Sequence, residues 1–164
     1  GVTLTEYYHA GLDYYFLTGR SGDKAVLDAV PAWTRTGRSI KLFATPTVDT
    51  VPLERHFFAK VAKGASRGSH FFTSISSEQT LLTSINPTNL ALDAKPYLES
   101  IEGYAVPKTV AGACPSGTSP IYRAFKGPPT FVDDGNHRFS TTLAQHQDMV
   151  RLGWTDEGVV FCGL

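Results

Sequence analysis

Three short segments of the chain contain residue types that could do binding chemistry. They are residues 13–18, 69–74 and 136–141. Each begins with a short polar residue, continues through a histidine or aromatic residue and runs into a Ser or Thr, so that Tyr14, His70 and His137 match one another. A metal site needs three nitrogen or carboxylate ligands around one ion, and Tyr14 weakens that interpretation. Two interpretations of these matching residues are left: each ring contacts a ligand, or each is a structural ring that fixes the turn.

Aromatic residues follow each segment. Trp33, Tyr97 and Trp154 are expected to hold equivalent places, and each precedes a glycine by a few residues. Aromatic rings beside polar side chains are typical of a sugar site, because the apolar face of a pyranose stacks on an aromatic plane. The candidate ligand-binding residues are Asp13, Tyr14, His70, Asn136 and His137, with Trp33 and Trp154 as stacking partners. The alternative is that these aromatic residues are core or seam residues.

Charged residues show a second pattern. The chain contains three similar copies, at about residues 4–44, 53–106 and 120–163. The second and third copies carry an arginine on the expected first strand and a glutamate before the closing glycine, whereas the first copy has the reverse. The pattern predicts one ion pair in each copy: Arg55 with Glu102, Arg123 with Glu157, and Glu6 with Arg35 or Arg38. A hydrolase that used Glu102, Glu157 and a histidine is conceivable, although nothing in the spacing selects it.

Other catalytic and metal signatures are absent from the sequence. Residues 133–136, Asp-Asp-Gly-Asn, lack the acidic spacing of a calcium loop and favour a plain turn. The chain has no Gly-X-Ser-X-Gly, His-Glu-X-X-His or phosphate-loop motif. We therefore expect a non-enzymatic protein without a metal or cofactor.

The elements that must position these residues form an internal repeat of about residues 4–44, 53–106 and 120–163. Each copy is expected to read strand, strand, short helix, aromatic residue, glycine, strand. A unit of this size cannot bury its own apolar face, so three should pack around a pseudo-threefold axis as one domain. We expect a β-rich, three-bladed propeller-like ring. A β-trefoil-like barrel is the alternative, and the helix in each copy argues against it.

Composition limits the partners. Lys and Arg together number 15, as do Asp and Glu, so the net charge is zero and no attraction to nucleic acid is indicated. No run of 18 apolar residues exists, so we expect no membrane insertion. Cys114 and Cys162 would be free thiols in a reducing cytosol and joined outside the cell. We favour the disulfide and an extracellular location.

A resemblance covers essentially the whole chain. Its marks are Glu6-Tyr7-Tyr8-His9, Asp13-Tyr14-Tyr15-Phe16, His70-Phe71-Phe72-Thr73 and Gly153-Trp154-Thr155-Asp156-Glu157-Gly158. These motifs resemble an uncharacterised secreted repeat-domain family of bacteria and fungi, found alone or appended to extracellular hydrolases. Tyr14 stands where that family usually has a histidine. The resemblance implies the repeat fold and secretion rather than a mechanism.

Together these observations predict a secreted, lectin-like module that binds glycans or cell-surface carbohydrate at up to three related sites. The alternative is a structural, protein-targeting or cell-wall-targeting domain without a small-molecule site. A hydrolase is the least favoured interpretation.

Overall fold

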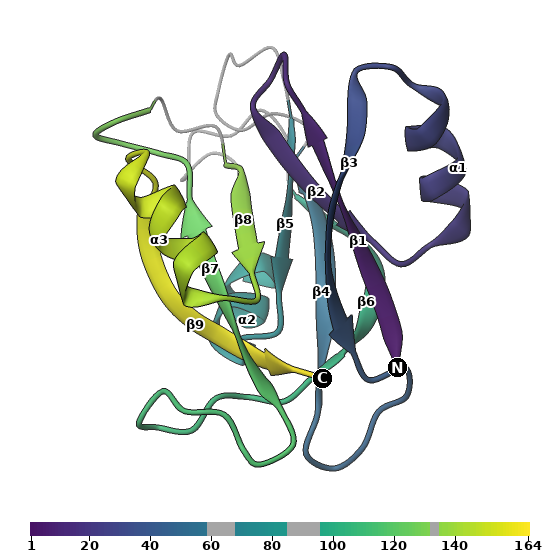
Figure 1. Cartoon of the computed structure of the whole chain (residues 1–164). Helices are drawn as coiled ribbons and strands as arrows, with labels where there is room; N and C mark the ends of the chain where they lie inside the picture. Colours follow the sequence, from purple (N-terminus) through teal and green to yellow (C-terminus); the bar gives the residue numbers. More distant parts are fainter. Residues whose placement is uncertain (59–67, 85–95, 132–134) are drawn as a thin grey trace.

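The computed structural model describes residues 1–58, 68–84, 96–131 and 135–164, which form three antiparallel sheets and three short helices (Figure 1). Unit 1 contains β1 (Val2–His9), β2 (Tyr14–Thr18), α1 (Ser21–Ala29) and β3 (Trp33–Leu42). Unit 2 contains β4 (Val51–Phe58), β5 (Ser69–Thr73), α2 (Ser76–Ser84) and β6 (Tyr97–Ala105). Unit 3 contains β7 (Ser119–Phe125), β8 (His137–Ser140), α3 (Leu143–Arg151) and β9 (Thr155–Gly163). The predicted β-rich, roughly threefold architecture with short helices is confirmed.

Each sheet places the first strand of its unit in the centre. The strand orders are β2-β1-β3, β5-β4-β6 and β8-β7-β9, and every pairing is antiparallel. The described strands do not close into a barrel, which a β-trefoil-like fold would require. The three sheets therefore have the same topology.

The three sheets touch through the ends of their last strands. Phe43, just after β3, pairs with Tyr104 of β6, and Val106, just after β6, pairs with Cys162 of β9. The Leu164 amide then donates to the Lys41 carbonyl at 2.8 Å, which links β9 to β3. Figure 1 shows the two termini beside each other at this end. These bonds satisfy backbone groups that would otherwise stay open at the sheet edges.

The main core lies between the sheets and has a threefold composition. Leu4, Leu53 and Ile121 hold the same place on the three central strands and are almost fully buried. Leu17, Phe72 and Phe139 of the neighbouring strands β2, β5 and β8 pack in the same cluster. The core thus depends on all three units, as expected for units that cannot bury an apolar face alone.

Strand register corrects our alignment of unit 1 by one residue. Glu6, Arg55 and Arg123 lie opposite Leu17, Phe72 and Phe139 respectively. It follows that Tyr15, and not Tyr14, is the equivalent of His70 and His137. Tyr14 is instead the equivalent of Ser69 and Asn136. Two adjacent tyrosines left this register open in the sequence, and a shift of one residue changes the face on which each side chain lies.

The aromatic residues that open the last strands need a similar correction. Tyr8, Phe57 and Phe125 hold the same place on the three central strands. The residues opposite them are Thr34, Tyr97 and Thr155 respectively. Trp33 and Trp154 are therefore equivalent, and Tyr97 lies one position further along its strand.

The predicted disulfide is present and joins Cys114 to Cys162 across a sequence separation of 48. It ties the connection between units 2 and 3 to β9. Among the described residues, no helix is long and apolar enough to cross a membrane.

Candidate functional site

Units 1 and 2 meet at Arg55 of β4. Its guanidinium contacts Asp23 of unit 1 at 2.7 Å, and Glu102 and Glu99 of its own unit at 2.6 and 3.2 Å. It also lies over the ring of Phe16 from unit 1, with 5.1 Å to the centroid. The Arg55 side chain is only 8% exposed, so this junction is a largely dry cluster of one cation and three carboxylates.

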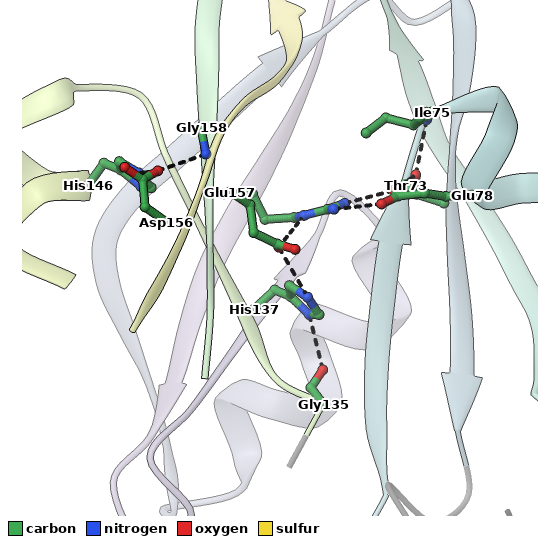
Figure 2. Close-up of polar contacts among 10 residues, drawn as sticks. Thr73, Ile75, Glu78, Gly135, His137, His146, Asp156, Glu157 and Gly158 are labelled. Atoms are coloured by element: carbon green, nitrogen blue, oxygen red, sulfur yellow. Dashed lines mark hydrogen bonds and ion pairs between the residues drawn. The ribbon is translucent and has the colours of Figure 1, made fainter. Parts of the chain in front are cut away.

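Units 2 and 3 meet in the same way at Arg123 of β7. Its guanidinium donates two hydrogen bonds to Glu78 of unit 2, at 3.0 and 2.7 Å, and one to Glu157 of its own unit at 2.7 Å. It lies over the Phe71 ring at 5.2 Å. Figure 2 shows Glu78, Glu157 and His137 gathered at this junction.

Units 3 and 1 meet with the charges reversed. Glu6 of β1 accepts hydrogen bonds from Arg138 of unit 3 at 2.9 and 3.1 Å and from the Thr36 hydroxyl at 2.8 Å. Arg138 also lies over the Tyr15 ring, 4.1 Å from its centroid. The prediction that Glu6 pairs with Arg35 or Arg38 is wrong, because the facing cation comes from another unit; Arg35 pairs with Asp28 instead.

The predicted Arg55–Glu102 and Arg123–Glu157 pairs are confirmed, but the two glutamates are not equivalent. Glu99 is the counterpart of Glu157, because each contacts the arginine and the histidine of its own unit. Glu102 is an additional carboxyl group whose side chain is 1% exposed, and burial raises its pKa. Its position inside the junction gives it no open access to a substrate.

The two equivalent histidines use their ring nitrogens differently. His70 contacts Glu99 through Nε2 at 2.8 Å. His137 contacts Glu157 through Nε2 at 3.3 Å and the Gly135 carbonyl through Nδ1 at 3.1 Å. Burial lowers the pKa of both rings, that of His137 to about 3. Both are therefore neutral near pH 7, and His137 has a structural role on both sides of its ring.

A pocket of about 190 Å³ opens beside His70. It is lined by Leu12, Tyr14, Tyr15, Phe16, Trp33, Phe57, Gly68, Ser69, His70 and Asn136. Tyr14, Ser69 and Asn136 are equivalent residues of the three units, so the pocket includes the pseudo-threefold axis. The pocket therefore brings together four of the predicted ligand-binding residues: Tyr14, Trp33, His70 and Asn136.

The polar groups of this pocket differ in what they already bind. The Asn136 amide accepts from the Tyr15 N–H at 3.0 Å and donates to the Tyr15 carbonyl at 3.1 Å, which ties β8 to β2. The Ser69 hydroxyl is buried and has no hydrogen-bond partner among the described residues. The His70 side chain is 30% exposed and packs against the rings of Phe16 and Phe57, each 4.8 Å away.

The other three predicted residues lie outside the pocket. Asp13 accepts from the Tyr8 hydroxyl at 2.7 Å and pairs with Lys126 at 3.2 Å, in a turn where its φ is +53°. Aspartate tolerates this left-handed conformation better than most residues. Trp154 is 3% exposed and packs against Tyr15, so it presents no face for stacking. His137 completes the junction described above, and Asp133 and Asp134 of the proposed turn lie outside the described residues.

Sequence reasoning missed Tyr15, Phe16, Phe57 and Ser69 of the pocket. The correct register would have identified Tyr15, since it occupies the place of the two histidines. Sequence reasoning also missed a pair in unit 3, in which Nε2 of the buried His146 contacts the exposed Asp156 at 2.6 Å and ties α3 to β9 (Figure 2). No three His, Cys, Asp or Glu side chains converge as metal ligands in the part of the chain that the structure describes.

Part of the chain matches a known protein-family model. Residues 92–164, which contain the last strand of unit 2 and all of unit 3, match the model of a domain of unknown function, DUF5648. No curated protein matches the chain. No solved structure matches it either.

Proposed function

We propose that the protein is a secreted, non-enzymatic carbohydrate-binding module that holds one sugar ring in the axial pocket. The observation that supports this best is the convergence of Tyr14, Trp33, His70 and Asn136, from all three units, on one pocket. Their convergence supports the sugar-site interpretation.

The size and lining of the pocket suit a single ring. Pockets for drug-sized molecules have volumes of about 300–1,000 Å³, whereas this one has about 190 Å³. Five aromatic side chains line it and offer apolar surface to a pyranose face. His70 adds a polar edge that fixes orientation, as expected when a few polar groups determine specificity in an apolar site.

One site is proposed here in place of three. The equivalent residues Tyr14, Ser69 and Asn136 differ in size and chemistry, and the place of His70 is taken by Tyr15 in unit 1. Arg138 already covers a face of Tyr15, while both nitrogens of His137 have partners. Divergence of the units thus leaves the region around His70 as the open one.

Two finer features belong to the same proposal. A three-bladed, propeller-like arrangement of the sheets would place the pocket at the mouth of the axis. Secretion is supported by the Cys114–Cys162 disulfide, because such bonds persist in oxidising compartments. The resemblance to secreted repeat domains appended to hydrolases points to the same location.

A glycan array with purified protein tests the proposal. We expect selective binding that is lost in His70→Ala and Trp33→Ala, each checked for folding by circular dichroism. His137→Ala is the matched control, because His137 holds the same place in unit 3 but does not line the pocket. Equal loss in all three variants, or no selective binding, would overturn the proposal. The second outcome would favour the alternative of a structural, protein-targeting or cell-wall-targeting domain.

A further inference from the structure

We infer that His70 determines specificity by accepting a hydrogen bond at Nδ1 from a free hydroxyl group of the bound ring, and that Glu99 positions it to do so. This inference rests on the proposed function and adds the direction of one hydrogen bond. It requires a neutral ring with an unsubstituted hydroxyl group at that edge of the pocket.

The contact with Glu99 fixes which nitrogen carries the hydrogen. An ionised carboxylate can only accept hydrogen bonds, and Glu99 Oε1 lies 2.8 Å from His70 Nε2. The neutral ring therefore carries its hydrogen on Nε2 and keeps a lone pair on Nδ1. No hydrogen-bond partner for His70 Nδ1 is found among the described residues. Nδ1 is also absent from the fully buried polar atoms without a partner, so it is not sealed inside the protein. The His70 side chain lines the pocket and is 30% exposed, which is the basis for placing a bound hydroxyl group at Nδ1.

The charged groups around His70 keep this arrangement in place. Glu99 of β6 approaches it directly, Arg55 of β4 contacts Glu99 at 3.2 Å, and Asp23 of unit 1 contacts Arg55 at 2.7 Å. Burial lowers the pKa of His70, Glu99 raises it and Arg55 lowers it, with a net lowering. The rings of Phe16 and Phe57 pack against the imidazole. Both its protonation and its orientation are therefore set before any molecule binds.

His137 shows why the inference applies to one histidine only. Its Nδ1 lies 3.1 Å from the Gly135 carbonyl and its Nε2 lies 3.3 Å from Glu157, so both ring nitrogens already face acceptor groups of the protein. Its ring is also outside the pocket lining. The same residue type at the equivalent place thus has no open ring nitrogen for a bound molecule.

Two measurements test the inference. First, nitrogen NMR of histidine-labelled protein reads the tautomer of His70 without any added sugar; we expect the hydrogen on Nε2. Second, calorimetric titration compares the methyl pyranosides of glucose, galactose and mannose with their monodeoxyfluoro derivatives, in which fluorine cannot donate. For the pyranoside that binds, one fluorine substitution should weaken binding about tenfold, as expected when a desolvated acceptor loses its donor.

Glu99→Gln should reduce that tenfold difference to less than about twofold, because an amide can accept from or donate to Nε2 and no longer fixes the tautomer. Glu157→Gln is the matched control, since Glu157 contacts the arginine and histidine of unit 3 in the same way; it should leave the difference unchanged. A hydrogen on Nδ1, or a bound pyranoside with no sensitive hydroxyl, would overturn this inference and leave the proposed function standing. If no pyranoside binds and the array is also negative, both fail.

Discussion

The junction at Arg123 and the junction at Glu6 occupy equivalent places and have opposite charges. At the first, a cation of the central strand binds Glu78 of the preceding unit and covers Phe71. At the second, an anion binds Arg138, which stands where Phe71 stands in unit 2. The partner changed together with the central residue, so the contact survived while its charges reversed. What is retained among the units is the contact between them and not the residue type.

The pocket shows the opposite behaviour. The junctions preserve one geometry with different residues, whereas the equivalent positions Tyr14, Ser69 and Asn136 differ without any compensation that restores the symmetry. This difference indicates that the junctions hold the fold and that the residues of the axial region were free to diverge. The predictions below test this division.

The largest effect is expected for Arg123→Met. It leaves Glu78 and Glu157 facing each other without a cation in a largely buried place, and breaking such a pair costs about 3–5 kcal/mol of unfolding free energy. Urea denaturation followed by circular dichroism measures this. Arg35→Met is the control, because the Arg35–Asp28 pair is exposed and should contribute less than about 1 kcal/mol.

Charge exchange within that junction sharpens the result. Arg123→Glu should destabilise at least as much, and adding Glu157→Arg should restore part of the loss through a coupling of about 1 kcal/mol or more. Strictly additive costs would show that the two side chains are not energetically coupled.

Converting the Glu6 junction into the Arg55 type tests the comparison directly. Glu6→Arg alone places two guanidinium groups together and should cost about 2–4 kcal/mol. Adding Arg138→Phe and Gln145→Glu supplies the ring and the carboxylate that the other two junctions have, and should recover at least half of the loss. Thermal and urea unfolding of the single and triple variants decide this; no recovery would mean that the junctions are not interchangeable.

The next effect is a pH dependence of stability. The pKa of His137 is about 3 in the folded protein because of burial, and a histidine in the unfolded chain titrates near 6.5. Between these values the unfolded state binds more protons, so the unfolding free energy falls as pH falls, by about 2 kcal/mol from pH 6.5 to 5. Lowered pKa values of Asp23 and Glu78 add to the loss at lower pH.

His137→Gln should remove most of the slope between pH 6.5 and 5. Urea titrations at pH 7, 6 and 5 provide the comparison, and an unchanged slope in the variant would assign the pH dependence to other groups.

The smallest effect is expected at the pocket. Ser69→Ala removes a buried hydroxyl that has no hydrogen-bond partner in the described part of the chain, so stability should stay within about 0.5 kcal/mol of the original protein. Asn136→Ala at the equivalent place should cost about 1–3 kcal/mol, because it leaves the N–H and carbonyl of Tyr15 unpaired. Equal costs for the two substitutions would contradict the difference in hydrogen bonding between these equivalent pocket residues.

Much of the fold could be predicted from the chain, and some of the site. The repeated segments showed the three units, and the arginine–glutamate pattern identified two junction pairs correctly. The register of unit 1 could not be read because two adjacent tyrosines fit either face of a strand. The partner of Glu6 was missed because Arg138 lies 132 positions away and in another copy, so no local spacing connects them. Burial of Trp154 likewise depends on packing between units.

That separation of 132 positions also has a consequence for how the chain acquires its structure. The Glu6–Arg138 contact and the Leu164–Lys41 backbone bond join the first strands made to the last. During synthesis, β1 and β3 must wait for unit 3 before their outer contacts can form. Proteins dominated by such distant contacts fold slowly, because the chain loses the entropy of closing a long loop before the stabilising contacts have formed. We therefore expect a single late and cooperative folding step, with units 1 and 2 aggregation-prone until the last strand arrives.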